Sequence, residues 1–486
     1  MGSEDQKLHI FFFPFMAHGH RIPMIDIVRL FAARGTKCTI ISTPLNALHF
    51  AESIDRDKQS GLDIGILTIP FPAVQAGLPE GCEDQGSIPA PEMIVNFLEA
   101  VGMLLEPFNK LLQEHHPDCV VADAFLPWTT EVADRYGIPR LVFHGKCYFP
   151  LCVAENIKRF APHEKLTSDS ETFIVPGLPD QIEMTKSELH KGDTNAKFAD
   201  RHAIAQEAEE RSYGVLANSF YEMEPAYVEY FKKEMGRRAW SIGPVSLYNK
   251  TITSKAQRGE KSVNDEQLYL NWLDSREPGS VLYVCFGSIS HLGTAQVREI
   301  AMGLEASKIP FVWVVRMTNI EKEDFLPEGF EDRMEGKGLI IKGWAPQVLI
   351  LDHPAVGGFM THCGWNSTCE GISAGLPMIT WPMFADQFYN EKLVTQVLKI
   401  GIAAGNKTWK WWMEADTVFV TKERVNQVVA QLMGSGTEAD DMRRRARELG
   451  NMAKKAVEEG GSSYNDLTNL IQELRLHKQK SNNSKN

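Results

Sequence analysis

The sequence lacks several features that would assign it to common protein classes. It has 51 Lys and Arg against 63 Asp and Glu, a net charge of −12, and no long basic run, so we expect no nucleic-acid partner. No uninterrupted apolar stretch reaches the ~20 residues that a membrane-spanning helix needs. The eight cysteines form no CxxC pair and no metal-type spacing, which argues against a disulfide scaffold and a zinc site. These absences predict a soluble protein of the reducing cytoplasm.

Two nucleotide-binding motifs are also absent. No GxGxxG follows the first predicted strand, which disfavours a nicotinamide dehydrogenase, and the phosphate-binding lysine of a P-loop is missing. The apolar run over residues 8–16 follows Glu4 and Asp5 and contains Pro14. That arrangement predicts a buried strand rather than a signal peptide.

What the sequence does contain is a twofold alternation of short apolar strands with longer helical patterns. Strands are expected at residues 9–13, 38–42, 64–69, 119–122, 140–143 and 214–218, and again at 281–286, 311–315, 339–341, 358–361 and 378–380. Continuous apolar strands indicate parallel sheets covered on both faces. The chain is also too long for one core. The predicted fold class is therefore α/β, with two doubly wound, Rossmann-like domains facing a central cleft.

Composition predicts where the domains meet. We expect a first domain over residues 1–248, a flexible polar linker over 249–266 and a second domain over 267–459. A helix over about 460–476 is expected to pack back on the first domain, and residues 477–486 are expected to be a disordered tail. The expected oligomeric state is a monomer.

The segment from Trp344 to Gln387 is the most specific part of the sequence. It predicts a strand that ends at His362, a turn that contains Gly364, and a helix that begins near Asn366. Such a unit directs free backbone N–H groups and the positive end of the helix dipole toward one point, which suits a diphosphate. Further side chains of suitable chemistry are Ser367 for phosphate, Glu370 for ribose hydroxyls, Trp344 for a base, and Asp386 and Gln387 for sugar hydroxyls.

This 44-residue segment resembles the signature box of plant secondary-metabolite UDP-glycosyltransferases, which belong to glycosyltransferase family 1 and have the GT-B fold. The agreement holds in register from the Trp344-Ala345-Pro346-Gln347 string through His362-Cys363-Gly364-Trp365-Asn366-Ser367 to the end of the box. The resemblance implies a UDP-glucose donor, with no metal and no further cofactor. The implied donor-binding residues are Ser288, Trp344, Ala345, Gln347, His362, Gly364, Trp365, Asn366, Ser367, Glu370, Asp386 and Gln387.

In that family the residue that corresponds to Trp344 stacks on uracil, and Glu370 holds the ribose. The diphosphate is assigned to His362, Asn366, Ser367 and Ser288, and the sugar to Trp365, Asp386 and Gln387. Similar enzymes that use glucuronic acid often carry a cation in place of Trp365, and galactose users often carry His in place of Gln387, so both positions favour glucose. Alternatively, Gln387 only caps the helix that follows it.

A second candidate site lies after the first predicted strand. His20 precedes a helix expected over 24–33, and a histidine at a strand end can take a proton from an acceptor hydroxyl near neutral pH. Asp123, directly after the strand at 119–122, is placed to orient that imidazole. The resemblance implies the same pair, with His20 as catalytic base. The sequence departs from the family pattern at His18, for which a structural or acceptor-contacting role is expected, and at Arg21, which would depress the imidazole pKa if it lay close.

The acceptor side carries the weakest signal. Aromatic and apolar side chains at strand ends suit a flat or polycyclic hydrophobic molecule, although each of them alone is as compatible with a core position. Lys146 would narrow the pocket, pair with an acidic acceptor group, or lie on the solvated surface. The candidate acceptor-pocket residues are Phe15, His18, Phe125, Lys146, Phe149, Met184 and Phe384.

These features predict an inverting UDP-glucose-dependent O-glucosyltransferase. Its acceptor would be a hydroxyl group on a small hydrophobic plant metabolite, either a flavonoid or other phenolic, or a triterpenoid or steroid. The products would be a β-glucoside and UDP. The alternatives are another UDP-sugar donor, a sugar–sugar or C-glycosidic product, and a non-catalytic protein that binds UDP-sugar.

Overall fold

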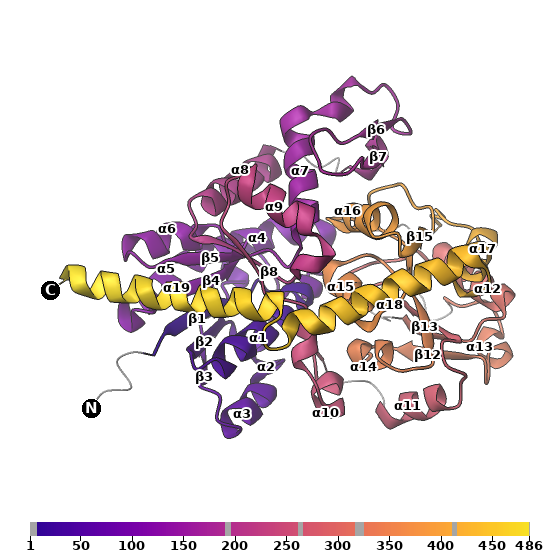
Figure 1. Cartoon of the computed structure of the whole chain (residues 1–486), viewed down its shortest axis with the longest axis horizontal. Helices are drawn as coiled ribbons and strands as arrows, with labels where there is room; N and C mark the ends of the chain where they lie inside the picture. Colours follow the sequence, from indigo (N-terminus) through magenta and orange to yellow (C-terminus); the bar gives the residue numbers. More distant parts are fainter. Residues whose placement is uncertain (1–6, 190–195, 261–265, 316–324, 411–415, 486) are drawn as a thin grey trace.

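The computed structural model describes residues 7–189, 196–260, 266–315, 325–410 and 416–485. Each half of the chain forms a parallel sheet flanked by helices (Figure 1). The first sheet has the order β3 (Ile64–Thr68), β2 (Lys37–Ser42), β1 (His9–Phe13), β4 (Cys119–Asp123), β5 (Arg140–Phe143), β8 (Gly214–Ala217) and β9 (Ala239–Ser241). The second has the order β12 (Gly338–Lys342), β11 (Phe311–Val315), β10 (Val281–Cys285), β13 (Val356–Thr361), β14 (Met378–Thr380) and β15 (Gly401–Ala403). These two sheets confirm the predicted fold class.

Helices cover the sheets because both sheet faces are apolar; β4 and β5, for example, are buried along their whole length. The helices of the first half are α1 (His18–Ala33), α2 (Pro44–Leu48), α3 (Ala51–Gln59), α4 (Ile94–Met103), α5 (Leu105–His115), α6 (Trp128–Arg135), α7 (Tyr148–Phe160), α8 (Ala196–Glu210) and α9 (Pro225–Lys233). Those of the second half are α11 (Glu266–Asp274), α12 (Thr294–Ser307), α13 (Phe330–Arg333), α14 (Gln347–Leu351), α15 (Trp365–Ala374), α16 (Gln387–Lys392), α17 (Lys422–Met433) and α18 (Thr437–Val457). No helix of the described residues is long and apolar enough to cross a membrane.

The strand order reverses between β1 and β4 in the first sheet and between β10 and β13 in the second. Phe13 lies in register with Ala122, and Cys285 lies in register with Thr361. Ligands of doubly wound sheets bind beyond the carboxyl ends of the strands at such reversals. The segments that follow these four strands therefore form the candidate site.

The segment predicted to be a flexible linker contains a short helix in the part that the structure describes. Helix α10 (Ile252–Ala256) begins with a capping box between Thr251 and Ser254, which satisfies the first amides of the helix. Lys255 Nζ lies 2.6 Å from Asp352 Oδ2, at the end of α14. Part of the predicted linker thus forms a helix, and its polar side chains take part in capping and in an ion pair.

The last helix, α19 (Ser462–Lys485), lies along the first sheet, end to end with α18 (Figure 1). Its side chains Leu467, Leu470, Ile471 and Leu474 join the core cluster of β1 and β2. The helix continues beyond residue 476, where Lys478 Nζ lies 3.0 Å from Asp118 Oδ2. The structure thus has a helix where the sequence predicted a disordered tail, and this contact joins its last turns to the first domain.

Four short strands were not predicted. They are β9, β15 and the hairpin of β6 (Thr172–Ile174) with β7 (Glu183–Thr185). Three residues of mixed polarity are too few to show a strand period. The structure also begins α1 at His18 rather than at residue 24, so that His20 lies in the first turn of the helix.

Candidate active site

His20 and Asp123 form a close pair at the carboxyl edge of the first sheet. His20 Nδ1 lies 2.7 Å from Asp123 Oδ2. The other carboxylate oxygen, Oδ1, accepts a hydrogen bond from the backbone N–H of Phe125 at 2.9 Å, and the aspartate is fully buried. Because Asp123 engages Nδ1, Nε2 is the ring nitrogen available for proton transfer.

Two aromatic rings border this pair. Phe15 and Phe125 each present their rings edge-on to His20, with centroids at 5.5 and 5.4 Å. Phe15 is buried, whereas Phe125 is 49% exposed. The surroundings of His20 thus suit an apolar molecule that brings a hydroxyl group to Nε2.

The remaining predicted acceptor residues do not gather around His20. Phe149 is fully buried and packs against Tyr227, with ring centroids 4.7 Å apart, so it belongs to the core rather than to a pocket wall. Phe384 is likewise buried, in the core of the second sheet. Lys146 Nζ lies 4.0 Å from Oδ1 of Asp386, a residue that is expected to bind the sugar of the donor.

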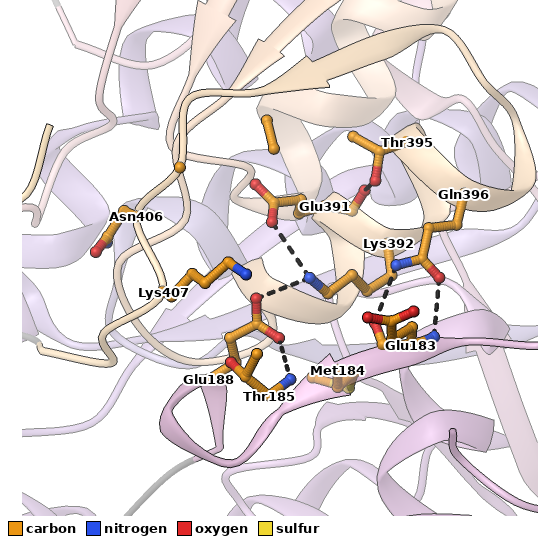
Figure 2. Close-up of a pocket in the computed structure, with 12 residues that line it drawn as sticks. Glu183, Met184, Thr185, Glu188, Glu391, Lys392, Thr395, Gln396, Asn406 and Lys407 are labelled. Atoms are coloured by element: carbon orange, nitrogen blue, oxygen red, sulfur yellow. Dashed lines mark hydrogen bonds and ion pairs between the residues drawn. The ribbon is translucent and has the colours of Figure 1, made fainter. Parts of the chain in front are cut away.

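Met184 lines a different pocket of about 220 Å³ between β7 and α16 (Figure 2). Lys392 Nζ there lies 2.8 Å from Glu188 Oε1 and 3.5 Å from Glu391 Oε1. Burial raises the pKa of Glu391 to about 7, although the neighbouring Lys392 opposes that shift. None of the predicted catalytic or donor residues lines this pocket. We interpret this pocket as part of the polar contact between the segment of the β6–β7 hairpin and the second domain.

The donor half of the site is built on the turn between β13 and α15. Cys363 adopts a left-handed conformation, φ 64°, which redirects the chain between the strand and Gly364, the N-cap of α15. Asn390 Nδ2 donates to the Cys363 carbonyl oxygen at 2.9 Å and fixes this turn. The first N–H groups of α15 have no carbonyl partner within the helix, which makes this helix start the candidate diphosphate site.

His362 is held tightly beside this turn. A Cβ at Gly287 would lie 2.4 Å from His362 Nε2, and a Cβ at Gly364 would lie 2.3 Å from it. Ser288 follows Gly287 in the loop after β10, and is half-buried. Burial lowers the pKa of His362 to about 4, so the ring is neutral near pH 7. Its buried Nδ1 has no hydrogen-bond partner among the described residues, which leaves it for a ligand.

Asn366 joins the two half-sites. Its Nδ2 donates to the backbone oxygen of Gly19 at 2.6 Å, in the first turn of α1 and directly before His20. Its buried Oδ1 has no partner in the part of the chain that the structure describes. Trp365 donates its Nε1 to the backbone oxygen of Asn218, at the end of β8, at 2.8 Å. Two contacts thus tie the start of α15 to the first domain, next to the candidate base.

Deeper along α15, a polar network surrounds Glu370. Gln347 Nε2 donates to Glu370 Oε2 at 2.7 Å and to Ser367 Oγ at 3.0 Å. The backbone oxygen of Ala345 accepts from Gln347 N–H at 2.8 Å, which shapes the turn before α14. The residues predicted to bind the uracil base and the ribose thus lie together on one side of α15.

Arg258 is a residue of this network that the sequence did not reveal. Its guanidinium pairs with Glu370 and, through Nε at 2.7 Å, with Asp26 of α1. A polar stretch of chain gives no signal for a buried arginine. The available signal was Asp26 itself, a carboxylate within the apolar stretch 24–28 of α1 that is fully buried and therefore needs a partner.

His18 and Arg21 lie away from the acceptor side. His18 Nε2 lies 2.5 Å from Glu260 Oε1, and its ring is 5.6 Å from that of Trp344. Arg21 donates from Nη1 to Asn46 Oδ1 at 2.6 Å and to Asp84 Oδ2 at 3.0 Å. His18 therefore lies beside Trp344, the residue expected to stack on uracil. Arg21 contacts Asn46 and Asp84 rather than the candidate catalytic base His20.

Asp386 and Gln387 close the donor segment at the start of α16. Gln387 Oε1 accepts hydrogen bonds from the backbone N–H groups of Met383 and Phe384, at 2.8 and 3.1 Å. Asp386 Oδ2 accepts from Asn390 Nδ2 at 2.8 Å. The amide oxygen of Gln387 thus fixes the turn before the helix instead of capping the helix that follows, and its amide nitrogen is the group left for a sugar.

Comparisons with known proteins find relatives that match this chain over nearly its whole length. The family model described as UDP-glucoronosyl and UDP-glucosyl transferase matches residues 223–409. Scopoletin glucosyltransferase of Nicotiana tabacum is 51% identical, over 97% of this chain and 98% of the relative. UDP-glucose flavonoid 3-O-glucosyltransferase 7 of Fragaria ananassa is 50% identical, over 96% of each chain.

A solved structure shows the same architecture. The crystal structure of Glycyrrhiza uralensis UGT73P12, complexed with glycyrrhetinic acid 3-O-monoglucuronide, superposes with a TM-score of 0.91 at 41% identity and covers 99% of this chain and 98% of that one. About half of the residues agree with the two plant relatives above over nearly the whole length. The chain is therefore a member of the plant UDP-glycosyltransferases of glycosyltransferase family 1.

Proposed function

We propose that this enzyme transfers glucose from UDP-glucose to a hydroxyl group of a small hydrophobic plant metabolite, with inversion at the anomeric carbon. One observation carries the proposal. The His20–Asp123 pair, 2.7 Å apart, adjoins the open N-terminus of α15 through the bond from Asn366 to Gly19. A base and an anion-binding helix end are thus within reach of one bound donor and one bound acceptor.

In the reaction that we propose, His20 Nε2 takes the proton of the acceptor hydroxyl. The acceptor oxygen forms a bond to the anomeric carbon of glucose while the bond from that carbon to the UDP oxygen breaks on the opposite face. An α-linked donor thereby gives a β-glucoside and UDP. Asp123 stabilises the imidazolium that forms, in the way that a buried carboxylate supports the histidine of a hydrolytic triad.

The leaving diphosphate gains negative charge as the bond breaks. We assign the stabilisation of this charge to the N–H groups of α15 together with His362, whose buried Nδ1 lacks a partner among the described residues and donates in the tautomer that carries hydrogen there. We expect full activity in excess EDTA at a matched ionic strength, measured as UDP released. Loss of activity that added Mg²⁺ restores would contradict this assignment.

The acceptor class follows from the surroundings of the base. Phe15 and the half-exposed Phe125 offer an aromatic wall beside His20, which suits a flat or polycyclic aglycone. The relatives are named for scopoletin and flavonoid acceptors, and the solved structure holds a triterpenoid glucuronide, so phenolics and triterpenoids are the acceptors to test.

A second donor has one observation in its favour. Lys146 Nζ lies 4.0 Å from Asp386 Oδ1, at the position expected for the sugar, and a cation there would also suit the carboxylate of UDP-glucuronate. Competition between equal concentrations of the two donors decides between them.

The test is mass spectrometry of products after the purified protein is incubated with UDP-glucose, or with UDP-glucuronate, and a panel of flavonoid, coumarin, triterpenoid and steroid acceptors. A gain of one hexose on one acceptor class supports the proposal and names the acceptor. A gain of one hexuronate instead assigns the second donor. Binding of UDP-glucose without any product would favour the non-catalytic alternative.

A further inference from the structure

Arg258 lies between two buried carboxylates that belong to different domains. Nε donates to Asp26 Oδ2 at 2.7 Å, and Nη1 pairs with Glu370 Oε1. Asp26 is fully buried on α1, Glu370 is buried on α15, and the arginine side chain is only 7% exposed. One cation thus connects the helix that carries the candidate base with the helix that carries the donor site.

The arrangement leaves Glu370 with little freedom. Its Oε1 pairs with Arg258, and its Oε2 accepts from Gln347 at 2.7 Å. At the other end, Asp26 Oδ1 accepts from Asn249 Nδ2 at 3.0 Å, so the anchor is itself fixed. A buried carboxylate without its cation would be strongly destabilised and would change its orientation or its protonation state.

The next residue contacts a second donor-site side chain. Gly259 has φ +100°, and a Cβ placed on it would lie 2.1 Å from Cζ2 of Trp344, with Cε2 at 2.9 Å and Cη2 at 3.0 Å. The contact is therefore centred on one edge atom of the indole. Such a contact fixes the position of the indole ring.

Glu260 extends the same pattern. Its Oε1 lies 2.5 Å from Nε2 of His18, whose ring in turn contacts Trp344. Three consecutive residues of the connecting segment therefore contact Glu370, Trp344 and the neighbour of Trp344. Helix α10 holds the start of this segment on the second domain through the ion pair of Lys255 with Asp352.

We propose that Arg258 is a positioning residue of the donor site: it holds the Glu370 carboxylate where it accepts the ribose hydroxyls and couples that orientation to Asp26 of the first domain. The inference rests on the proposed function, in which Glu370 binds the ribose. It differs from two other roles for the same arginine, which are direct binding of the diphosphate and competition with the nucleotide for the site.

The test compares the binding of UDP and of 2′,3′-dideoxy-UDP to four proteins by isothermal titration calorimetry. They are the wild type, Arg258→Ala, Arg258→Lys and the control Lys255→Ala, which removes a partly exposed ion pair of the same segment. We expect Arg258→Ala to weaken UDP binding about tenfold or more, because a charge-assisted contact is lost. Dideoxy-UDP lacks the hydroxyls that Glu370 would bind, so its affinity should change less than about twofold.

Three results would overturn the proposal. An equal loss for both nucleotides would mean that Arg258 contacts the phosphates, and tighter UDP binding by Arg258→Ala would mean that the segment competes with the donor. Unchanged UDP binding by Arg258→Ala would mean that the arginine has only a structural role. If the wild type does not bind UDP, the proposed function fails instead, which keeps the two failures distinguishable.

Two further measurements guard against a folding defect. Thermal unfolding shows whether Arg258→Ala is folded, and Arg258→Lys keeps the buried positive charge without the two-pronged geometry that bridges both carboxylates. For Arg258→Lys we expect a raised KM for UDP-glucose, an unchanged KM for the acceptor and a kcat within about twofold of wild type. A rise in the acceptor KM of the same size would contradict a role confined to the donor.

Discussion

At the residue scale, the catalytic assignment depends on one hydrogen bond. Asp123 fixes His20 through Nδ1, so that Nε2 is left for the acceptor. We expect His20→Ala to lower kcat for glucose transfer by about 10²–10⁴-fold, because general base catalysis contributes that much. Asp123→Asn should also lower kcat, since an amide can stabilise the wrong tautomer. UDP binding, measured by calorimetry, should remain at the wild-type value in both variants; a loss there would point to a structural defect.

A second residue-scale prediction concerns the packing of His362. In Gly287→Ala the new methyl group would meet the imidazole, because a Cβ there lies 2.4 Å from Nε2, and φ is +81°. We expect the KM for UDP-glucose to rise about tenfold or more. The matched control is Gly279→Ala, where φ is +70° and nothing lies within 4 Å of the added atom. The control should lose about 1 kcal/mol of stability and keep its KM; equal effects on KM would refute the steric argument.

The site residues that the sequence predicted are those whose chemistry is local. His362, Gly364 and Asn366 lie within one strand-turn-helix unit, so their spacing alone indicates an anion site. Arg258 and Gly259 could not be predicted, because their contacts depend on how α1 and α15 face one another. Gln387 shows a related limit, since the sequence allowed a sugar contact or a cap on the following helix, whereas its amide oxygen accepts from two N–H groups of the preceding turn.

At the element scale, α7 begins on a buried carboxyl group. Glu224 accepts hydrogen bonds from the backbone N–H groups of Tyr148 and Phe149, at 3.1 and 2.8 Å, and from the hydroxyl of Ser219. Burial raises the pKa of Glu224 to about 7 from its ordinary 4.5. Between these two values the folded state binds more protons than the unfolded state, so this group lowers stability as the pH rises through that range.

The measurable consequence is a change in the pH dependence of unfolding. Wild-type protein should lose up to roughly 3 kcal/mol of stability between pH 5 and pH 8 through this group. In Glu224→Gln, which keeps an oxygen acceptor for the amides of α7, that contribution should vanish. Urea unfolding at the two pH values gives the comparison. If the variant and the wild type lose stability in parallel, Glu224 is not the group that titrates.

Helices and strands could be predicted from the sequence where the pattern of apolar residues was long. Strands of four or more buried apolar residues, such as β1 and β11, agree closely with the prediction, because burial on both faces gives a continuous apolar run. The hairpin of β6 and β7 was not predicted, because some of its backbone hydrogen bonds are made with side chains that are distant in the sequence. Gln396 donates to the Glu183 carbonyl oxygen at 2.9 Å and accepts from its N–H at 3.0 Å.

At the scale of the whole molecule, α19 stabilises the first domain. Leu470 is fully buried against the core of β1 and β2, whereas Leu476 is 56% exposed. We expect Leu470→Ala to lower the free energy of unfolding by about 2–5 kcal/mol, because it opens a cavity. Leu476→Ala should stay within about 0.5 kcal/mol of wild type. Urea denaturation monitored by tryptophan fluorescence would show both, and equal losses would rule out this packing role.

The position of α19 also determines where the junctions of chimeric enzymes of this family can be placed. A chimera joined only at the connecting segment near residue 250 would give the first domain a foreign final helix, whose apolar side chains had adapted to another surface. Donor and acceptor preferences would then change together with stability, and the cause of either change would be obscured. Exchange of the second domain alone requires two junctions, one before α10 and one between α18 and α19.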